Sequence, residues 1–324
     1  MKIIKPSHEI MQHGNNPYKH IEKIGRICYR SENSVTENSA EPFCMRLFKS
    51  GHHAMLEHFR FIARVNETDY RYLIGNEHSK YLTFTSYDNR FIVSASARGL
   101  NDMYRSISDD IDSGNLSVYA IVVAENVKDI LEDIVTNIIT EYDCKELFST
   151  SLYGKFPVET GNVCVIKDFN NLSDDEYRAH AWYSIHFVCD RGVTHEMVRH
   201  RDASFAQEST RYCNYNKDKF GSEITVIEPM FWEHGTDEYN LWYNSCLVSE
   251  EAYMKLLNIG AKPQETRSVL PNSLKTEIVI TAQVYEWLHI FNLRVIGTTG
   301  APHPQIKQVM KPAYDEMIEK GYLI

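Results

Sequence analysis

The sequence predicts an α+β protein in which helices pack around a sheet. Two observations predict this class. Apolar residues recur at helical spacing in several segments of the 324-residue chain, and the segments 59–65 and 183–189 have the character of short strands. Hydrophobic residues make up 43% and charged residues 24% of the chain, as in an average globular protein. A disordered or fibrous protein is therefore excluded.

The first half of the chain predicts two helices and one strand. The helices are expected around Lys19–Cys28 and Glu41–Ser50, and the second ends at Gly51, a residue that favours helix termini. Phe59–Val65 is the expected strand. Residues 101–147 hold eleven acids and three bases, and their apolar residues recur at helical spacing from Val127 to Ile139. We expect an amphipathic helix with a solvated acidic face there; an acidic surface for a partner is the alternative.

The second half begins with a strand over Tyr183–Cys189, where apolar and other side chains alternate. Gly192 ends this run, and Thr194 is placed to cap a helix that reaches about His200. Residues 202–216 lack helical periodicity. Further helices are expected at 250–258, 262–270 and 274–292, with Pro271 between the last two, and at 305–320, with an interruption near Pro312.

Charge and composition exclude several classes of protein. The net charge of −10 disfavours a general nucleic-acid binder, which should be basic. No apolar run approaches the ~20 residues of a membrane helix, and the first residues lack the apolar core of an export signal. The seven cysteines never form CxxC, which disfavours a disulfide framework or a structural zinc site. We therefore expect a cytoplasmic protein with reduced, mostly buried thiols.

Familiar cofactor motifs are absent. The sequence has neither GxGxxG nor GxxxxGK[ST]. His195-Glu196 begins like a zinc-protease motif, but the next histidine, His200, follows His195 by five residues instead of the required four. Three histidines lie between Gly51 and His58, yet the first two are adjacent and diverge on any regular element. A polar wall of a ligand pocket is therefore favoured there over a metal site.

The segment from Arg199 to Tyr212 concentrates three arginines, a histidine and several hydroxyls in an acidic protein. If it is extended, Gln207, Ser209 and Arg211 point to one side, because strand side chains alternate. A hydroxyl and a guanidinium on one face suit a phosphate monoester. The alternative is a surface cluster of ion pairs with nearby acids.

Two later arginines, Arg267 and Arg294, border apolar runs. Such arginines usually extend to the surface. Held inward instead, a guanidinium could stabilise an anionic ring or a phosphate.

Four blocks in order resemble the flavin-dependent thymidylate synthases. Arg199-His200-Arg201 followed by seven residues and Ser209 is similar to the family's RHR signature. The other blocks are Gly51-His52 with Glu57-His58, Arg267-Ser268-Val269-Leu270-Pro271, and Leu293-Arg294 with His303-Pro304-Gln305. They cover residues 19–65 and 181–318. The resemblance implies a single catalytic domain over 1–324, with helices around a mainly antiparallel sheet and an inserted helical region at about 66–180.

The resemblance implies a reaction. Such enzymes methylate dUMP at C5, with 5,10-methylenetetrahydrofolate supplying the carbon and NADPH-reduced FAD supplying the hydride. They use no enzyme nucleophile on the pyrimidine, so neither Ser209 nor Cys213 need attack it. The family is a homotetramer whose sites combine several chains. No metal, nucleic acid or membrane is implied.

Residue roles follow by position. Arg294 is the implied catalytic residue, at the uracil edge, where it favours the ring deprotonated at N3. Ser209, Arg211 and Arg267 would hold the phosphate. The implied dUMP site comprises Glu196, Arg199, Gln207, Ser209, Arg211, Arg267 and Arg294. The implied FAD site comprises His52, Glu57, Arg199, His200, Arg201, Gln283, Tyr285 and His289.

The helix before Arg294 departs from the family pattern. Gln283 and Tyr285 stand where asparagine and arginine usually contact FAD. Tyrosine supplies no cation, so the pattern favours weaker or altered FAD binding. Two alternatives stay open: an enzyme that modifies UMP or a cytosine nucleotide, and a non-catalytic nucleotide- or RNA-binding protein.

Overall fold

The computed structural model describes residues 1–12, 16–65, 67–75, 81–99, 102, 164–165, 169–216 and 221–323. The chain divides into two compact units. Unit 1 comprises Met1–His13, Lys23–Val35 and Tyr183–Ile324, and unit 2 comprises Gly14–Glu22 and Thr36–Trp182. Both units combine helices with an antiparallel sheet, which confirms the predicted α+β class. No helix among the described residues has both the length and the apolarity needed to cross a bilayer.

Unit 1 is built on a four-stranded sheet with the order β2-β7-β10-β8. These strands are β2 (Ser7–Met11), β7 (Trp182–Asp190), β10 (Lys275–Gln283) and β8 (Ser204–Gln207). β2 pairs antiparallel with β7, and β8 pairs antiparallel with β10. A separate parallel pair joins β1 (Lys2–Ile4) to β9 (Thr225–Ile227). The predicted strand at 183–189 is thus confirmed.

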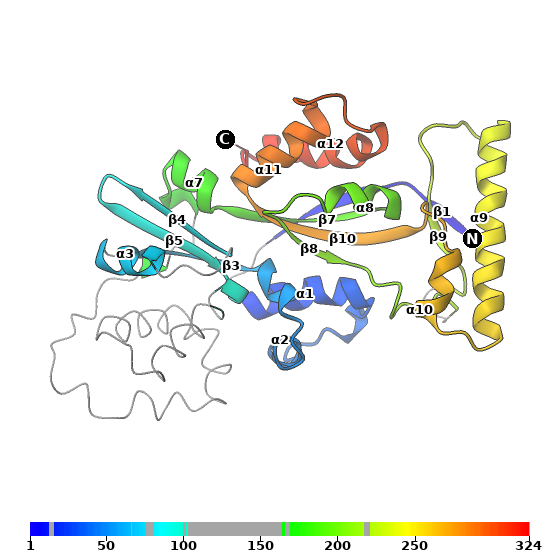
Figure 1. The fold of residues 1–324 in the computed structure, drawn as a ribbon, viewed down its shortest axis with the longest axis horizontal. Helices are drawn as coiled ribbons and strands as arrows, with labels where there is room; N and C mark the ends of the chain where they lie inside the picture. Colours follow the sequence, from blue (N-terminus) through cyan, green and yellow to red (C-terminus); the bar gives the residue numbers. More distant parts are fainter. Residues whose placement is uncertain are drawn as a thin grey trace. The chain divides into compact units, whose positions relative to one another are not determined.

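Three helices of unit 1 pack together on the main sheet. α8 (Arg191–Met197) and α11 (Val284–Phe291) both contact β10, while α12 (Pro304–Glu319) contacts β2, α8 and α11 (Figure 1). Between α11 and α12 lies η6 (Asn292–Ile296), a π-helical turn that contacts both. The core under these helices includes Ile185, Phe187 and Trp287, each fully buried.

The helix predicted at 274–292 is wrong over its first half. Residues 275–283 form strand β10, and only 284–291 are α-helical. Ile278, Val279 and Ile280 are each completely buried, so the strand is covered on both faces. A strand buried on both faces has a continuous apolar run, which periodicity cannot distinguish from a buried helix. The β-branched residues of this segment, from Thr276 to Thr281, favour the strand.

The helix expected before the RHR segment begins and ends earlier than predicted. Asp190, not Thr194, caps α8, because its Oδ1 accepts a hydrogen bond from the Val193 N–H at 2.7 Å. The helix ends at Met197, so Glu196 lies on it and His200 lies beyond it. The extended segment that follows ends at Gln207, and Ser209 begins a turn. Arg211 therefore does not continue the strand pattern.

The remaining helices of unit 1 differ from expectation mainly in extent. The segment 250–258 belongs to the longer α9 (Asp237–Asn258), and 262–270 divides into α10 (Pro263–Thr266) and the 3-10 turn η5 (Arg267–Val269). The expected break near Pro312 is wrong, because α12 runs through it. Ile306, Met310 and Met317 form part of a buried stripe, whose packing outweighs the hydrogen bond that proline removes.

Unit 2 holds an antiparallel sheet with the order β4-β5-β3-β6. Its strands are β4 (Leu82–Tyr87), β5 (Arg90–Ser96), β3 (Arg60–Val65) and β6 (Cys164–Val165). The β4–β5 hairpin turns at Asp88 and Asn89, which both have positive φ, as a two-residue I′ turn requires. The expected strand at 59–65 is confirmed by β3. The amphipathic segment from Val127 to Ile139 lies outside the described residues.

The helices of unit 2 include α2 (Ala40–Lys49), the 3-10 helix η2 (His53–His58), α3 (Glu67–Gly75), the 3-10 turn η3 (Phe169–Asn171) and α7 (Asp174–His180). α2 confirms the helix expected at 41–50, and Gly51 follows it with a φ of +74°. The 3-10 turn η1 (Glu32–Ser34) belongs to unit 1. α1 (Pro17–Tyr29) confirms the helix expected at 19–28, and its residues divide between the two units. Five cysteines of the described residues are buried free thiols, namely Cys28, Cys44, Cys189, Cys213 and Cys246.

Candidate functional site

The structure brings Arg294, Glu196 and His200 together in unit 1. Arg294 Nε donates to His200 Nε2 at 3.1 Å, while Nη1 donates to Glu196 Oε2 at 3.2 Å and Nη2 to the Glu196 carbonyl at 3.1 Å. The Arg294 side chain is 18% exposed, so it is held inward instead of extending into solvent. A guanidinium carries five N–H groups, so one remains on each terminal nitrogen for a ligand.

Arg294 is held by an unusual turn of backbone. It lies in η6, where the Gly297 N–H donates to the Asn292 carbonyl five residues back at 2.8 Å. Single π-turns of this kind occur often at functional sites. Gly297 closes the turn with a φ of +85°, and a Cβ there would lie 2.9 Å from the Gly300 carbonyl oxygen. Glycine is therefore required at this position.

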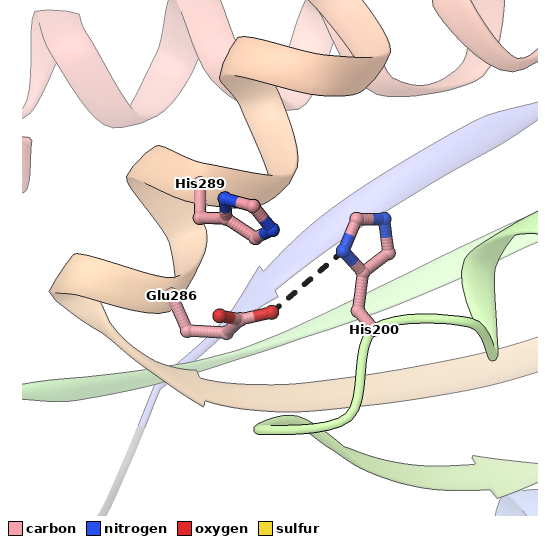
Figure 2. Close-up of side chains that lie close together, drawn as sticks. All are labelled: His200, Glu286 and His289. Carbon is pink, nitrogen blue, oxygen red and sulfur yellow. Dashed lines mark ion pairs between the residues drawn. The ribbon is translucent and has the colours of Figure 1, made fainter.

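His200 also faces α11. Its Nδ1 lies 3.7 Å from Glu286 Oε1, and the ring of His289 stands edge-on to it with centroids 5.8 Å apart (Figure 2). Burial, together with the charges of Arg294 and His289, lowers the pKa of His200 to about 4. Burial and the nearby Asp202 carboxylate raise the pKa of Glu286 to about 7. His200 is therefore neutral at pH 7, while Glu286 titrates there.

Four of the predicted arginines are exposed and unpaired. Arg199 and Arg201 lie in the loop after α8, Arg211 lies in the turn after β8, and Arg267 begins η5. Among the described residues, no carboxylate forms an ion pair with any of them. Arg211 instead stands 5.6 Å from the ring centroid of its neighbour Tyr212. The surface ion-pair cluster considered from the sequence is therefore not formed in the described part of the chain, and these cations are available to an anion.

Ser209 lies at the start of a tightly anchored turn. Its N–H donates to the Cys28 carbonyl at the end of α1 at 3.1 Å, and its Oγ accepts from the Arg211 N–H at 3.3 Å. The preceding Glu208 is buried, where its carboxylate accepts from Lys275 Nζ at 2.9 Å and from the Tyr215 hydroxyl at 3.1 Å. A buried ionic contact thus fixes the backbone on which the hydroxyl and guanidinium stand.

Gln207 turns its amide into the protein. Its Nε2 donates to Thr194 Oγ1 at 3.0 Å and to Thr276 Oγ1 at 3.3 Å, which leaves its Oε1 for other partners. Gln283, the other glutamine of the predicted site, is the buried N-cap residue of α11. Tyr285, by contrast, is 41% exposed.

His52 and Glu57 belong to unit 2. His52 is exposed and immediately precedes η2, and Glu57 lies within it. Glu57 Oε1 accepts from Arg98 Nη1 at 2.6 Å, and the Arg98 guanidinium lies 4.7 Å from the centroid of the Tyr81 ring. Glu57 is thus held by a cation of its own unit.

Sequence reasoning missed Glu286 and the two threonines that bind Gln207. Glu286 is an acid within the otherwise mostly apolar segment from Val284 to Phe291, a signal that could have pointed to a special role. Thr194 and Thr276 carried no such signal, because their contacts with Gln207 of β8 depend on how α8 and β10 lie beside that strand. A further grouping that the sequence did not predict is formed by His200, Glu286 and His289, whose potential ligand atoms lie within 4.8 Å of one another.

Comparison with known proteins identifies the family. The family model described as thymidylate synthase complementing protein matches residues 158–320, half of the chain. The chain therefore belongs to this family, and the resemblance inferred from the four blocks is confirmed.

Curated relatives share this part of the chain. The flavin-dependent thymidylate synthase of Pyrococcus furiosus is 32% identical over 107 residues, which are 33% of this chain and 43% of that protein. The one of Mycolicibacterium gilvum is 31% identical over 154 residues, 43% of this chain and 59% of that protein. The chain thus spans about two-fifths to three-fifths of the length of these relatives. A solved structure of a UMP/dUMP methylase, PolB from Streptomyces cacaoi, aligns over 43% of this chain and 68% of its own, with 19% identity and a TM-score of 0.36.

Proposed function

We propose that the protein is a flavin-dependent thymidylate synthase that converts dUMP to dTMP. The carbon comes from 5,10-methylenetetrahydrofolate and the hydride from FAD that NADPH has reduced. The observation that carries this proposal is the setting of Arg294. It is the cation of the final family block, and hydrogen bonds fix its orientation through three of its five N–H groups.

Arg294 is the catalytic residue in this account. We place the uracil ring against the two N–H groups that Arg294 does not use within the protein. A guanidinium at the edge of the ring stabilises the form deprotonated at N3, and the extra electron density makes C5 a better nucleophile. Because Arg294 is already oriented by Glu196 and His200, little reorganisation is needed when the charge develops.

The phosphate of the nucleotide is assigned to Ser209, Arg211 and Arg267. Arginine binds phosphate oxygens with a two-pronged fork, and neither arginine is paired with a carboxylate in the described part of the chain. Arg199, Glu196 and Gln207 complete the proposed dUMP site. No thiol is needed, and Cys213, the cysteine nearest the signature, is only 1% exposed.

The donor set of unit 1 fits FAD in charge. Arg199 and Arg201 are exposed cations that suit its diphosphate, and His200, His289, Gln283 and Tyr285 complete the proposed contacts in this unit. His52 and Glu57, which belong to unit 2, are proposed as FAD contacts on the family resemblance alone. When bound, reduced FAD supplies the hydride. The exposed ring of Tyr285 offers stacking but no charge, so we expect this position to contribute least to the binding of FAD. We further propose a cytoplasmic homotetramer built from single catalytic domains, each with an insertion at about 66–180.

A flavin titration tests the proposal. The purified protein is mixed with FAD, its visible spectrum is recorded, and dUMP, UMP and dCMP are then added in parallel. A flavin band that shifts with dUMP alone supports the proposed site, and Arg294→Lys serves as the variant in which the shift changes. A shift with UMP or dCMP instead would transfer the proposal to that nucleotide. Nucleotide binding without any flavin binding would favour the non-catalytic alternative.

A further inference from the structure

A buried carboxyl on α11 has no role in the proposed reaction. Glu286 is 4% exposed and lies on a helix whose buried residues include Val284, Trp287 and Ile290. Burying a carboxyl in apolar surroundings is costly unless a polar group compensates it. The polar group that it faces is Nδ1 of His200, 3.7 Å from Oε1 (Figure 2).

The contact with Arg294 shows where the proton of His200 lies. A guanidinium only donates hydrogen bonds, so His200 Nε2 must accept from Arg294 Nε with a lone pair. The single proton of the neutral ring is then on Nδ1, and it points toward Glu286. At 3.7 Å this contact is longer than a hydrogen bond, so the negative carboxyl oxygen favours the Nδ1–H form through its charge. The N–H groups thus form a series in which Arg294 donates to His200 and the His200 N–H points toward Glu286. Arg294 donates separately to Glu196.

The same series argues against a metal ion at His200, Glu286 and His289. A metal on Nδ1 needs the lone pair there, which would move the proton to Nε2. The Nε2 proton would then oppose the N–H of Arg294 Nε across 3.1 Å. A metal at this cluster thus requires the loss of the Arg294 contact, and its own charge would repel the guanidinium.

We propose that Glu286 is a positioning residue for Arg294: it holds His200 in the Nδ1–H tautomer, so that Nε2 accepts from Arg294 and fixes the guanidinium. The contribution to catalysis rests on the proposed function, whereas the tautomer does not. Glu286 touches no substrate in this account and acts through His200. Asp202 and His289 complete its charged surroundings among the described residues.

Two variants of Glu286 separate positioning from packing. Glu286→Gln keeps an oxygen acceptor, whereas Glu286→Leu keeps a similar volume and removes it. The full-length protein, labelled with ¹⁵N-histidine, is studied by long-range ¹H–¹⁵N correlation at pH 7, and the His200 signal is assigned by its loss in His200→Asn. We expect the Nδ1–H pattern in the wild type and Glu286→Gln, and a mixture of tautomers in Glu286→Leu. Thermal unfolding verifies that both variants fold.

Kinetics provide the second readout. We expect kcat for dUMP to fall about three- to tenfold in Glu286→Leu, the effect of one buried polar contact, and to stay within about twofold in Glu286→Gln. An unchanged tautomer and kcat in Glu286→Leu would overturn the proposal, as would Zn²⁺ binding to the wild type that Glu286→Gln abolishes. A wild type without synthase activity would refute the proposed function, and the imidazole signal alone would then decide the positioning role.

Discussion

Replacing Glu286 by glutamine should change how the stability of the protein depends on pH, because folding shifts the pKa values of both Glu286 and His200. The pKa of Glu286 is raised to about 7 from an ordinary value of 4.5, and that of His200 is lowered to about 4 from 6.5. Each shift is worth roughly 3 kcal/mol, because one pKa unit corresponds to about 1.4 kcal/mol. Both side chains are at most 5% exposed, so solvent screens these energies little.

The two shifts act in opposite directions. The contribution of Glu286 to stability is fully present below pH 4.5 and is lost as the pH rises through 7, because the unfolded chain ionises first. His200 is neutral in the folded protein, so stability is lost as the pH falls from 6.5 through 4, where the unfolded chain binds a proton first. Between about pH 4.5 and 6.5 the two slopes nearly cancel in the wild type.

Urea unfolding at several pH values tests this balance. Relative to the wild type, Glu286→Gln should gain about 3 kcal/mol in free energy of unfolding as the pH rises from 4.5 to 7.5. His200→Asn should gain a similar amount as the pH falls from 6.5 to 4. Glu37→Gln, which changes an exposed glutamate, is the control and should follow the wild type. Parallel curves for the wild type and Glu286→Gln would refute the assigned environment of this carboxyl.

Further predictions concern the site directly. Arg294→Lys should lower kcat at least about 100-fold while dUMP affinity changes less than about tenfold, because lysine keeps the charge but not the two-pronged guanidinium. Near-normal product formation by this variant would show that Arg294 takes no part in the chemistry. Arg267→Gln should weaken dUMP binding about tenfold but leave deoxyuridine binding unchanged in calorimetry; equal losses would show that Arg267 does not hold the phosphate. Tyr285→Arg should tighten FAD, measured by flavin fluorescence; an unchanged affinity would show that the pocket has rearranged. Gly297→Ala should lower the free energy of unfolding by about 1–3 kcal/mol, measured by thermal unfolding, and Gly260→Ala should lower it less. Both glycines have positive φ, but only Gly297 lacks room for a Cβ. Equal losses would contradict the requirement for glycine after η6.

Much of the fold could be predicted because its signals are local. The helix at 41–50 ends at a glycine, and the strand at 183–189 alternates, so sequence spacing alone located both. The segment 275–283 could not be assigned in this way, since it is a strand covered on both faces and its burial depends on distant elements. The helix break expected near Pro312 was wrong for the same reason, because the tertiary packing of α12 outweighs the local preference of proline.

In the candidate site, the sequence predicted which residues take part, but their atomic contacts depend on the fold. The motifs named Arg294, Glu196 and His200, but not which atoms meet. Their contacts arise because the end of α8, with the residues that follow it, approaches the π-turn η6, almost a hundred residues away in sequence. Gln207 was expected to face the nucleotide, yet its amide donates to two threonines that neighbouring backbone brings into reach.

Formation of dTMP tests the central claim most directly. The protein is incubated with FAD, NADPH, ¹³C-labelled 5,10-methylenetetrahydrofolate and dUMP, and the nucleotides are separated and analysed by mass spectrometry, with Arg294→Lys in parallel. We predict dTMP that carries the labelled carbon in the wild type and at least about 100-fold less in the variant. Absence of labelled dTMP from FAD-loaded wild-type protein, or equal amounts from both proteins, would contradict it.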